Sequence, residues 1–196
     1  GALPTVSSLG INIDPASGNY KNATISRGTI NIDNINNNKV FDLDNPDDAL
    51  NKNGYYSSNL NLVAGSTING TQSGQIAMGQ NSYSGAFDNT KVKLLNDGTV
   101  SLAGASSGGM YANFGTITNN GDINVTGSDS VGMYGVNGTA IVNSGNILVG
   151  NKGVGIYGIS GQNTLTQSAY GNKKVNITNN SSIVSTSGTE NVLGIY

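Results

Sequence analysis

Residues 117–135 read ITNNGDINVTGSDSVGMYG, and residues 141–158 read IVNSGNILVGNKGVGIYG. Each stretch contains an apolar residue, an Asn/Gly turn, an alternating pair such as Ile123 and Val125, and a Gly-hydrophobic-Tyr segment. Side chains two residues apart point to the same face of a strand, so this alternation predicts strands with one buried face. Each stretch therefore predicts three short strands joined by tight turns.

The pattern extends well beyond these two stretches. A Gly-Met-Tyr or Gly-Ile-Tyr triplet contains each of Tyr111, Tyr134, Tyr157 and Tyr196, and the first three triplets recur at intervals of 23 residues. A unit of this length cannot bury its apolar face alone, so successive units must stack. We therefore predict an all-β fold, a right-handed parallel β-helix (β-solenoid) of about seven coils of roughly 23 residues with corner-loop insertions.

Stacking makes equivalent residues of successive coils into internal columns. We predict three such columns: Val100, Ile123, Ile147 and Ile183; Leu102, Val125 and Val149; and Met78, Met110, Met133, Ile156 and Ile195. Weaker copies of the unit occur earlier, around Ile68, Ile30 and Ile11. Glycine and asparagine at the corners are explained by turns that need a positive φ, and stacked asparagines are expected to form amide ladders.

Composition excludes several classes of function. The 196 residues include 29 glycines and only 10% charged residues, and the net charge is −2 with one arginine, so we expect no nucleic-acid partner. Histidine and cysteine are absent, which excludes disulfides, His or Cys metal ligands and Ser-His-Asp or Cys-His catalysis within the chain. We find no apolar run that predicts a membrane span, and interpret residues 1–196 as a single β-helix fragment of a larger protein.

Three segments interrupt the repeat, at about 42–58, 80–91 and 161–175. If Val40 is the equivalent of Met133, all three leave by the same corner, after the third strand of a coil. Loops that leave one edge of a solenoid gather on one face, where repeat proteins commonly bind. The alternative is a corner that simply tolerates insertions.

Acidic residues offer little support for a metal or catalytic site. Asp42, Asp44, Asp47 and Asp48 form a carboxylate-rich loop that could bind calcium, but the EF-hand spacing fails, which leaves a solvated loop as the alternative. Asp122, Asp129 and Glu190 lack an acidic partner on the same face of an adjacent coil. The GxGxxG sequence at 153–158 lies inside the repeat and no helix follows it. We therefore expect a non-enzymatic chain without a metal or cofactor.

Four tyrosines follow the third internal column by one residue. Tyr111, Tyr134, Tyr157 and Tyr196 should therefore point outward and stack. A row of exposed tyrosines can bind sugars or protein partners, because each ring presents a rigid aromatic surface. The alternative is that the stack only stabilises the solenoid.

The coils at 117–135 and 141–158 resemble passengers of type Va bacterial autotransporters, and the Asn-, Lys- and Ile-leaning composition is similar to that of the large adhesins of fusobacteria. The resemblance implies export through a C-terminal β-barrel outside this chain, and display on the outer membrane of the cell. It also implies adhesion to a protein or glycan on host cells or other bacteria. The first alternative is a stalk or spacer that carries a toxin or protease domain elsewhere in the parent protein. A β-helical polysaccharide lyase or phage tailspike is the second.

Overall fold

The computed structural model describes residues 11–17, 20–26, 28–34, 55–56, 59–79, 93–160 and 174–196, which form three sheets. The first sheet contains, in spatial order, β1 (Ile11–Ser17), β2 (Tyr20–Ile25), β5 (Asn59–Leu62), β8 (Lys93–Asn96), β11 (Thr116–Asn119), β14 (Ala140–Asn143) and β17 (Asn176–Asn179). The second contains β3 (Thr29–Asn31), β6 (Thr67–Gly70), β9 (Thr99–Leu102), β12 (Asp122–Val125), β15 (Asn146–Val149) and β18 (Ile183–Ser185). The third contains β4 (Tyr55–Tyr56), β7 (Ile76–Gly79), β10 (Gly108–Asn113), β13 (Val131–Val136), β16 (Val154–Ile159) and β19 (Leu193–Ile195).

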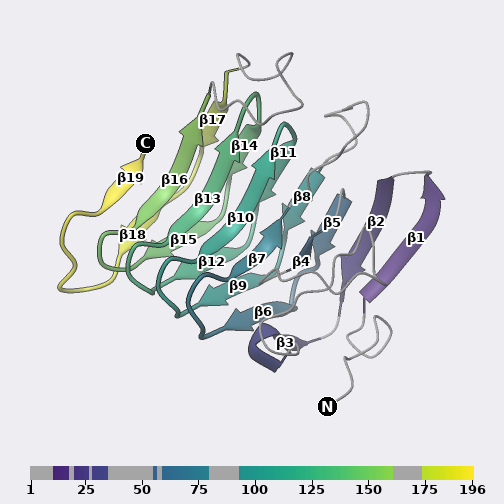
Figure 1. Cartoon of the computed structure of the whole chain (residues 1–196), viewed down its shortest axis with the longest axis horizontal. Helices are drawn as coiled ribbons and strands as arrows, with labels where there is room; N and C mark the ends of the chain where they lie inside the picture. The colour runs from purple at the N-terminus through teal and green to yellow at the C-terminus, as the bar shows by residue number, and fades with distance from the viewer. Residues whose placement is uncertain are drawn as a thin grey trace.

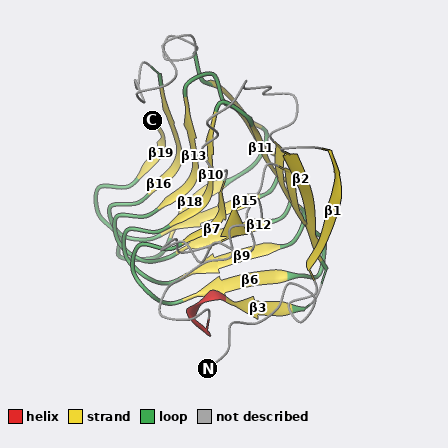
Figure 2. Ribbon diagram, turned by 45° about the vertical axis from the view of Figure 1, so that its right-hand side comes forward, coloured by secondary structure: helices red, strands yellow, loops and turns green. Residues whose placement is uncertain are grey.

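From β2 onward the chain visits the three sheets in the same order, so that three consecutive strands make one coil. Figures 1 and 2 show these coils stacked along the molecule, with the strands of each sheet side by side. From β2 to β19 every strand pairs with its neighbours in parallel. The predicted all-β parallel β-helix with a repeat of about 23 residues is therefore confirmed. Among the residues described, no helix is long and apolar enough to cross a bilayer.

The described strands make six coils, and β1 does not begin a seventh. It pairs with β2 in the antiparallel sense, with Ile11 opposite Ile25 and Ser17 opposite Tyr20. Two residues separate these strands in the sequence, whereas a parallel connection needs a dozen or more. The interpretation of the Ile11 region as an early copy of the coil is therefore wrong. Gly18 and Asn19 lie between two alternating runs, which is a pattern typical of a β-hairpin. This pattern could have indicated the antiparallel pairing from the sequence.

The three predicted internal columns are confirmed. Val100 aligns with Ile123, and that column continues through Ile147 to Ile183. Met110 aligns with Met78 and Met133, and the column continues through Ile156 to Ile195. All of these side chains are fully buried except the two in the last coil. The buried columns of the three sheets meet in one hydrophobic core inside the coils.

A column of asparagines also lies inside the solenoid, at the corner between the first two sheets. Asn96 donates to Asn119, Asn119 donates to Asn143, and Asn143 donates to Asn179, each from Nδ2 to Oδ1 across 2.8 Å. The first three side chains are fully buried. Each inner amide thus gives one hydrogen bond and receives one, so the predicted amide ladder is confirmed with its polar groups satisfied.

Three glycines at the same corner have a different role from the one expected. Gly98, Gly121 and Gly145 do not have a positive φ. A Cβ on Gly121 would instead lie 2.0 Å from the carbonyl oxygen of Gly98, and a Cβ on Gly145 would lie 1.9 Å from that of Gly121. The explanation by positive φ is therefore wrong for these three glycines, because it is the close approach of stacked backbones that requires glycine there. It holds at the same corner of the first two coils, where Gly28 and Gly65 have φ 23° and 82°.

Positive φ occurs mainly at the next corner, between the second and third sheets, and mostly in other residue types. Ser106, Asp129, Lys152 and Asn191 have φ between 54° and 56°. Their turns lie one above another, since the amide of Ser106 donates to Ser128 of the next coil and that of Asp129 donates to Asn151. The stacked hydrogen bonds hold these residues in a conformation that their type does not favour alone.

Most of the predicted insertions, 42–58, 80–91 and 161–175, lie outside the described residues. Four residues are exceptions. Lys174 and Val175 of the third precede β17, and Tyr55 and Tyr56 of the first form β4, which pairs with β7 so that Tyr55 aligns with Met78. Tyr55 therefore takes the place that was assigned to Val40, and that equivalence is wrong. The long connection of the first coil precedes its third strand, whereas 80–91 and 161–175 follow the third strands β7 and β16.

A carboxylate adds side-chain hydrogen bonds to the strand pairing between the first and second coils. Asp33 lies in the 3-10 turn η2 (Ile32–Asn34) and accepts hydrogen bonds from the backbone amide of Thr71 at 2.9 Å and from Nε2 of the buried Gln75 at 2.7 Å. Burial alone would raise the pKa of Asp33, but the hydrogen bonds from Thr71 and Gln75 outweigh it and hold the pKa below its ordinary value of 3.8. The hydrogen bonds between the first two coils therefore favour the ionised form of Asp33 in the folded chain.

Candidate functional site

The outer face of the third sheet carries a continuous row of tyrosines. Tyr111, Tyr134 and Tyr157 align on β10, β13 and β16, and Tyr196 follows β19. Adjacent rings are stacked with centroids 5.4, 4.9 and 5.1 Å apart and with planes inclined by 18°, 7° and 3°. The first three rings are half-buried, and Tyr196 is 65% exposed. The prediction that these tyrosines point outward and stack is confirmed.

The alternation of the strands puts the row in this place. Met110 and Met133 are fully buried, and the tyrosine that follows each of them faces the opposite side of the sheet. Parallel in-register pairing then places every ring beside the ring of the next coil. The row is interrupted at β7, where Gly79 aligns with Tyr111. Tyr111 is therefore the first of four consecutive rings.

Stacking changes the acidity of these phenols. Burial raises the pKa of Tyr111 above its ordinary value of 10.0, and the neighbouring Tyr134 raises it further. Burial likewise raises the pKa of Tyr134, with a second contribution from Tyr157. A phenolate within the row would lose solvation and meet the charge of the next phenolate. At neutral pH Tyr111 and Tyr134 therefore present uncharged rings and hydroxyl groups.

We predict that the free energy of unfolding decreases at high pH, when Tyr111 and Tyr134 ionise. The phenol pKa is higher in the folded chain than in the unfolded chain, where it is about 10. The stabilisation is therefore complete below about pH 10 and is lost as the pH rises through the folded value. Denaturant melts at several alkaline pH values should show this decrease, and ultraviolet titration should show late ionisation of Tyr111 and Tyr134. In the Tyr134→Phe variant the pKa of Tyr111 should fall; an unchanged value would contradict the coupling.

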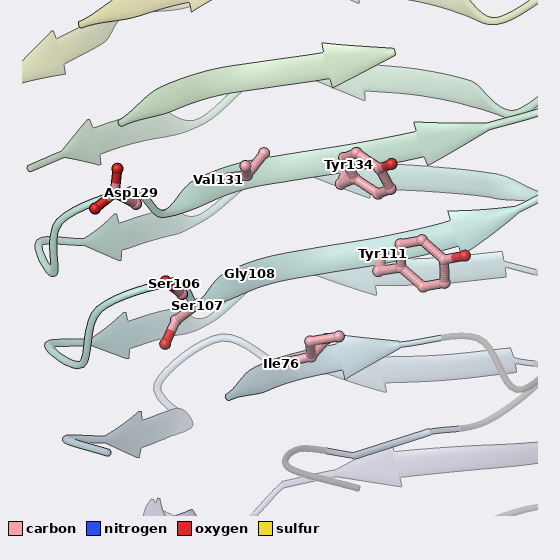
Figure 3. A pocket seen from close by; sticks show the side chains of 8 residues that line it. All are labelled: Ile76, Ser106, Ser107, Gly108, Tyr111, Asp129, Val131 and Tyr134. Atoms are coloured by element: carbon pink, nitrogen blue, oxygen red, sulfur yellow. The ribbon is translucent and has the colours of Figure 1, made fainter. Parts of the chain in front are cut away.

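A notch lies beside the first two rings of the row. Its volume is about 300 Å³, and it is lined by Ile76, Ser106, Ser107, Gly108, Tyr111, Asp129, Val131 and Tyr134. Figure 3 shows its layout: Tyr111 and Tyr134 lie further along β10 and β13, while Ser106, Ser107 and Asp129 lie at the turns that precede these strands. The notch thus has apolar walls on the sheet, tyrosines at one end and a polar rim at the other.

One glycine produces the notch. The outward row that contains Gly108 has Ile76 on one side and Val131 on the other, and continues to Val154 and Leu193. Gly108 alone in this row lacks a side chain, so a gap opens between its two neighbours. This notch was not among the sites predicted from the sequence. The sequence feature that could have indicated the notch is Gly-Gly-Met at 108–110, because the next two coils have Val-Gly-Met and Val-Gly-Ile at the equivalent positions.

The other candidate Asp122 does not join this site, and four further candidates are not placed. Asp42, Asp44, Asp47 and Asp48 lie outside the described residues. Asp122 is on β12 of the second sheet, where its Oδ1 accepts a hydrogen bond from Asn146 at 3.0 Å. Within the described part of the chain, no group of three or more acidic side chains is placed to hold a metal ion. Of the acidic residues considered from the sequence that the structure describes, only Asp129 lies at the notch.

Comparison with known proteins adds no family to this description. No protein-family model matches the chain, and no curated protein or solved structure matches it. The parallel β-helical architecture is therefore established by the coordinates alone.

Proposed function

We propose that this chain is a non-catalytic adhesive stretch of a surface-exposed passenger of the type Va autotransporter kind. It attaches its cell to a protein or glycan on host cells or on other bacteria. The observation that carries the proposal is the row Tyr111, Tyr134 and Tyr157, which lies on the outer face of a regular solenoid beside a notch.

Physical properties of the row suit recognition of another surface. Tyrosine combines a large apolar ring with a hydroxyl that can donate or accept a hydrogen bond, so it binds both apolar and polar partners. The stacked rings are already ordered in the free chain, so little side-chain entropy is lost on binding. Aromatic residues with these properties are common among the side chains that dominate binding energy at interfaces.

The autotransporter part of the proposal rests on the resemblance of the repeated coils. The architecture agrees with that class, since each coil completes its core only by stacking on the coil before it. We therefore expect the parent protein to carry a C-terminal β-barrel and to display this stretch on the outer membrane. The partner is a host-cell or bacterial surface protein or glycan, and no cofactor is involved.

Attachment of beads coated with the whole chain tests the adhesive function. Beads should attach to cultured epithelial cells or to bacteria of other species. We expect a variant in which Tyr111, Tyr134 and Tyr157 are replaced by threonine to bind at least about tenfold more weakly, because interface aromatics contribute about 2 kcal/mol each at hot spots. Threonine keeps a high strand propensity, and circular dichroism verifies the fold of the variant.

Matched substitutions on another face provide the control. Thr118, Val142 and Thr178 align on the outer face of the first sheet, and their replacement by serine should leave attachment unchanged. Deletion of 80–91 tests the alternative in which a corner loop makes the contact. Equal attachment by the tyrosine variant and the wild-type chain would reject the row as the adhesive surface. Failure of the wild-type chain to attach to any cell would reject adhesion by this stretch.

A stalk or spacer is the second candidate, and the ladder from Asn96 to Asn179 favours it. These hydrogen bonds run along the stack axis and join successive coils without interruption. A spacer needs this stiffness and no binding surface. In that case an unrelated β-helix of equal length would replace the segment in the parent protein without loss of activity.

A further inference from the structure

We infer that the notch at Gly108 accepts a lysine side chain of a protein partner, with the aliphatic stem in the notch and the ammonium group at Asp129. The inference rests on the proposed function, because it needs a partner that binds this face, and it commits that partner to a protein. Three features of the notch lead to it: the space over Gly108, the apolar walls and the acidic rim.

The space over Gly108 is large enough for a side chain and is bounded by the neighbouring strands. A Cβ built on Gly108 would lie 3.8 Å from Cγ1 of Ile76 and 4.0 Å from the carbonyl oxygen of Val131. Both are ordinary van der Waals separations, so the position leaves room for a methylene chain from outside. Val131 fills the same place in the next coil, which shows that a side chain fits the spacing of the stack at this row.

The walls are apolar on the sheet. Ile76 and Val131 are on either side of the gap, and Tyr111 and Tyr134 close its far end. A lysine stem of four methylenes buries apolar surface in such a place while its charged end stays at the rim, as long basic side chains commonly do. A fully apolar side chain would match the walls but would leave the acidic rim without a partner.

Among the described residues, Asp129 is the one charged residue that lines the notch, and its backbone is held by the stack. It has φ 56°, and its amide donates to Asn151 of the next coil at 3.0 Å. The residue is exposed, and we find no ion pair of its carboxylate with a side chain of the described ranges. A negative rim favours a cation and opposes phosphate or acidic sugars. The hydroxyl of Ser106, also at the rim, can accept a second hydrogen bond from the ammonium group.

Two other charged residues lie at the same corner. Lys152 takes the place of Asp129 in the next coil, and its amide donates to the backbone of Glu190 in the coil after that. The positive charge of Lys152 repels a bound cation, and it also attracts the carboxylate of Asp129. Both effects weaken binding of a cation at the notch. The glutamate is one coil further away, so Asp129 determines the charge at the notch.

Two matched probes test the inference on the whole 15N-labelled chain. The first is Nα-acetyl-lysine methylamide, and the second is the same molecule with an acetylated Nε, which keeps the stem and removes the charge. Both should move the amide resonances of Gly108 and Val131. The lysine probe should bind about fivefold more tightly at low salt, the ratio that an exposed ion pair supplies, and the ratio should approach one in high salt.

Single substitutions separate the stem from the charge. Asp129→Asn should reduce the ratio to one, whereas Asp122→Asn, which removes an exposed acid from the second sheet, should leave it unchanged. Lys152→Gln should raise it. Gly108→Val should abolish binding of both probes, and it should fold because Val131 and Val154 occupy the same row. Equal affinity of the two probes, shifts confined to other residues, or tighter binding of methyl glucoside at Gly108 would each overturn the inference.

Attachment assays keep this inference distinct from the proposed function. If the probes bind at Gly108 but the chain attaches to no cell, the adhesive function fails and the lysine site stands. If the chain attaches and Asp129→Asn lowers attachment, the notch is part of the adhesive contact. If attachment is unaffected by both Asp129→Asn and Gly108→Val, the partner does not use the notch and the inference fails, while adhesion by the tyrosine row stands.

Discussion

Replacing Gly121 by alanine is expected to lower the free energy of unfolding by about 3 kcal/mol or more, beyond the usual cost of an overfilled core position. The added Cβ would lie 2.0 Å from the carbonyl oxygen of Gly98, which is backbone and cannot rotate away. Moving it would strain the hydrogen bond from the amide of Asp122 to the same carbonyl, which measures 3.0 Å. Urea unfolding followed by circular dichroism measures the effect.

Gly194→Ala is the matched control for this substitution. No atom lies within 4 Å of a Cβ built on Gly194, and its φ is not positive, so the change should alter stability by no more than about 0.5 kcal/mol. Gly108→Ala is a second control, since its nearest contact is 3.8 Å away. If Gly121→Ala were as stable as the Gly194→Ala chain, the corner could widen freely, and close stacking would not explain its glycines.

The parts of the fold that were predictable are those that repeat. Met110, Met133 and Ile156 recur at one spacing and all have large apolar side chains, so a single assignment fixes the sheet, the face and the register of three strands. The outward position of Tyr134 then follows from the alternation of a strand. A wrong strand assignment in one coil becomes evident from the next coil, because every coil must stack in the same register.

The parts that were missed occur once. β1 has no equivalent in later coils, and its antiparallel pairing with β2 depends on a short local turn rather than on the repeat. Tyr55 lies where a long connection ends, and no spacing identifies the end of such a connection. The notch arises because Gly108 differs from the valine at the same position of the next coil, and a repeat pattern predicts only what the coils share.

The chemical reason for a residue was harder to predict than its position. Glycine and asparagine were both expected at the corners, and both are there. The sequence does not distinguish a glycine that needs a positive φ, such as Gly74, from one that meets a carbonyl of the next coil, such as Gly121. That distinction depends on how closely the backbones of two coils approach, which only the coordinates show.

Replacing Asn119 by leucine is expected to destabilise the chain by about 3 kcal/mol, because two buried groups each lose a hydrogen bond, at about 1–3 kcal/mol each. Nδ2 of Asn96 loses its acceptor at 2.8 Å and keeps the carbonyl oxygen of Asp122 at 3.2 Å, while Oδ1 of Asn143 loses its donor at 2.8 Å. Asn119→Asp should cost more at neutral pH, since it keeps the acceptor but puts a charge in the column. Burial would raise the pKa of this carboxyl, so the extra cost should decrease as the pH falls.

A double-mutant cycle separates the ladder from the loss of asparagine as such. Once Asn119 is leucine, Oδ1 of Asn143 has already lost its donor, so Asn143→Leu removes an unsatisfied group. The double variant should therefore be more stable than the sum of the single changes predicts, by about 1–2 kcal/mol. Leu62 aligns with Asn96 in the second coil, so leucine fits this column. The control pair Asn119 and Asn124 lies on different sheets and should be additive within about 0.5 kcal/mol; additivity in the first pair would mean that the amides act independently.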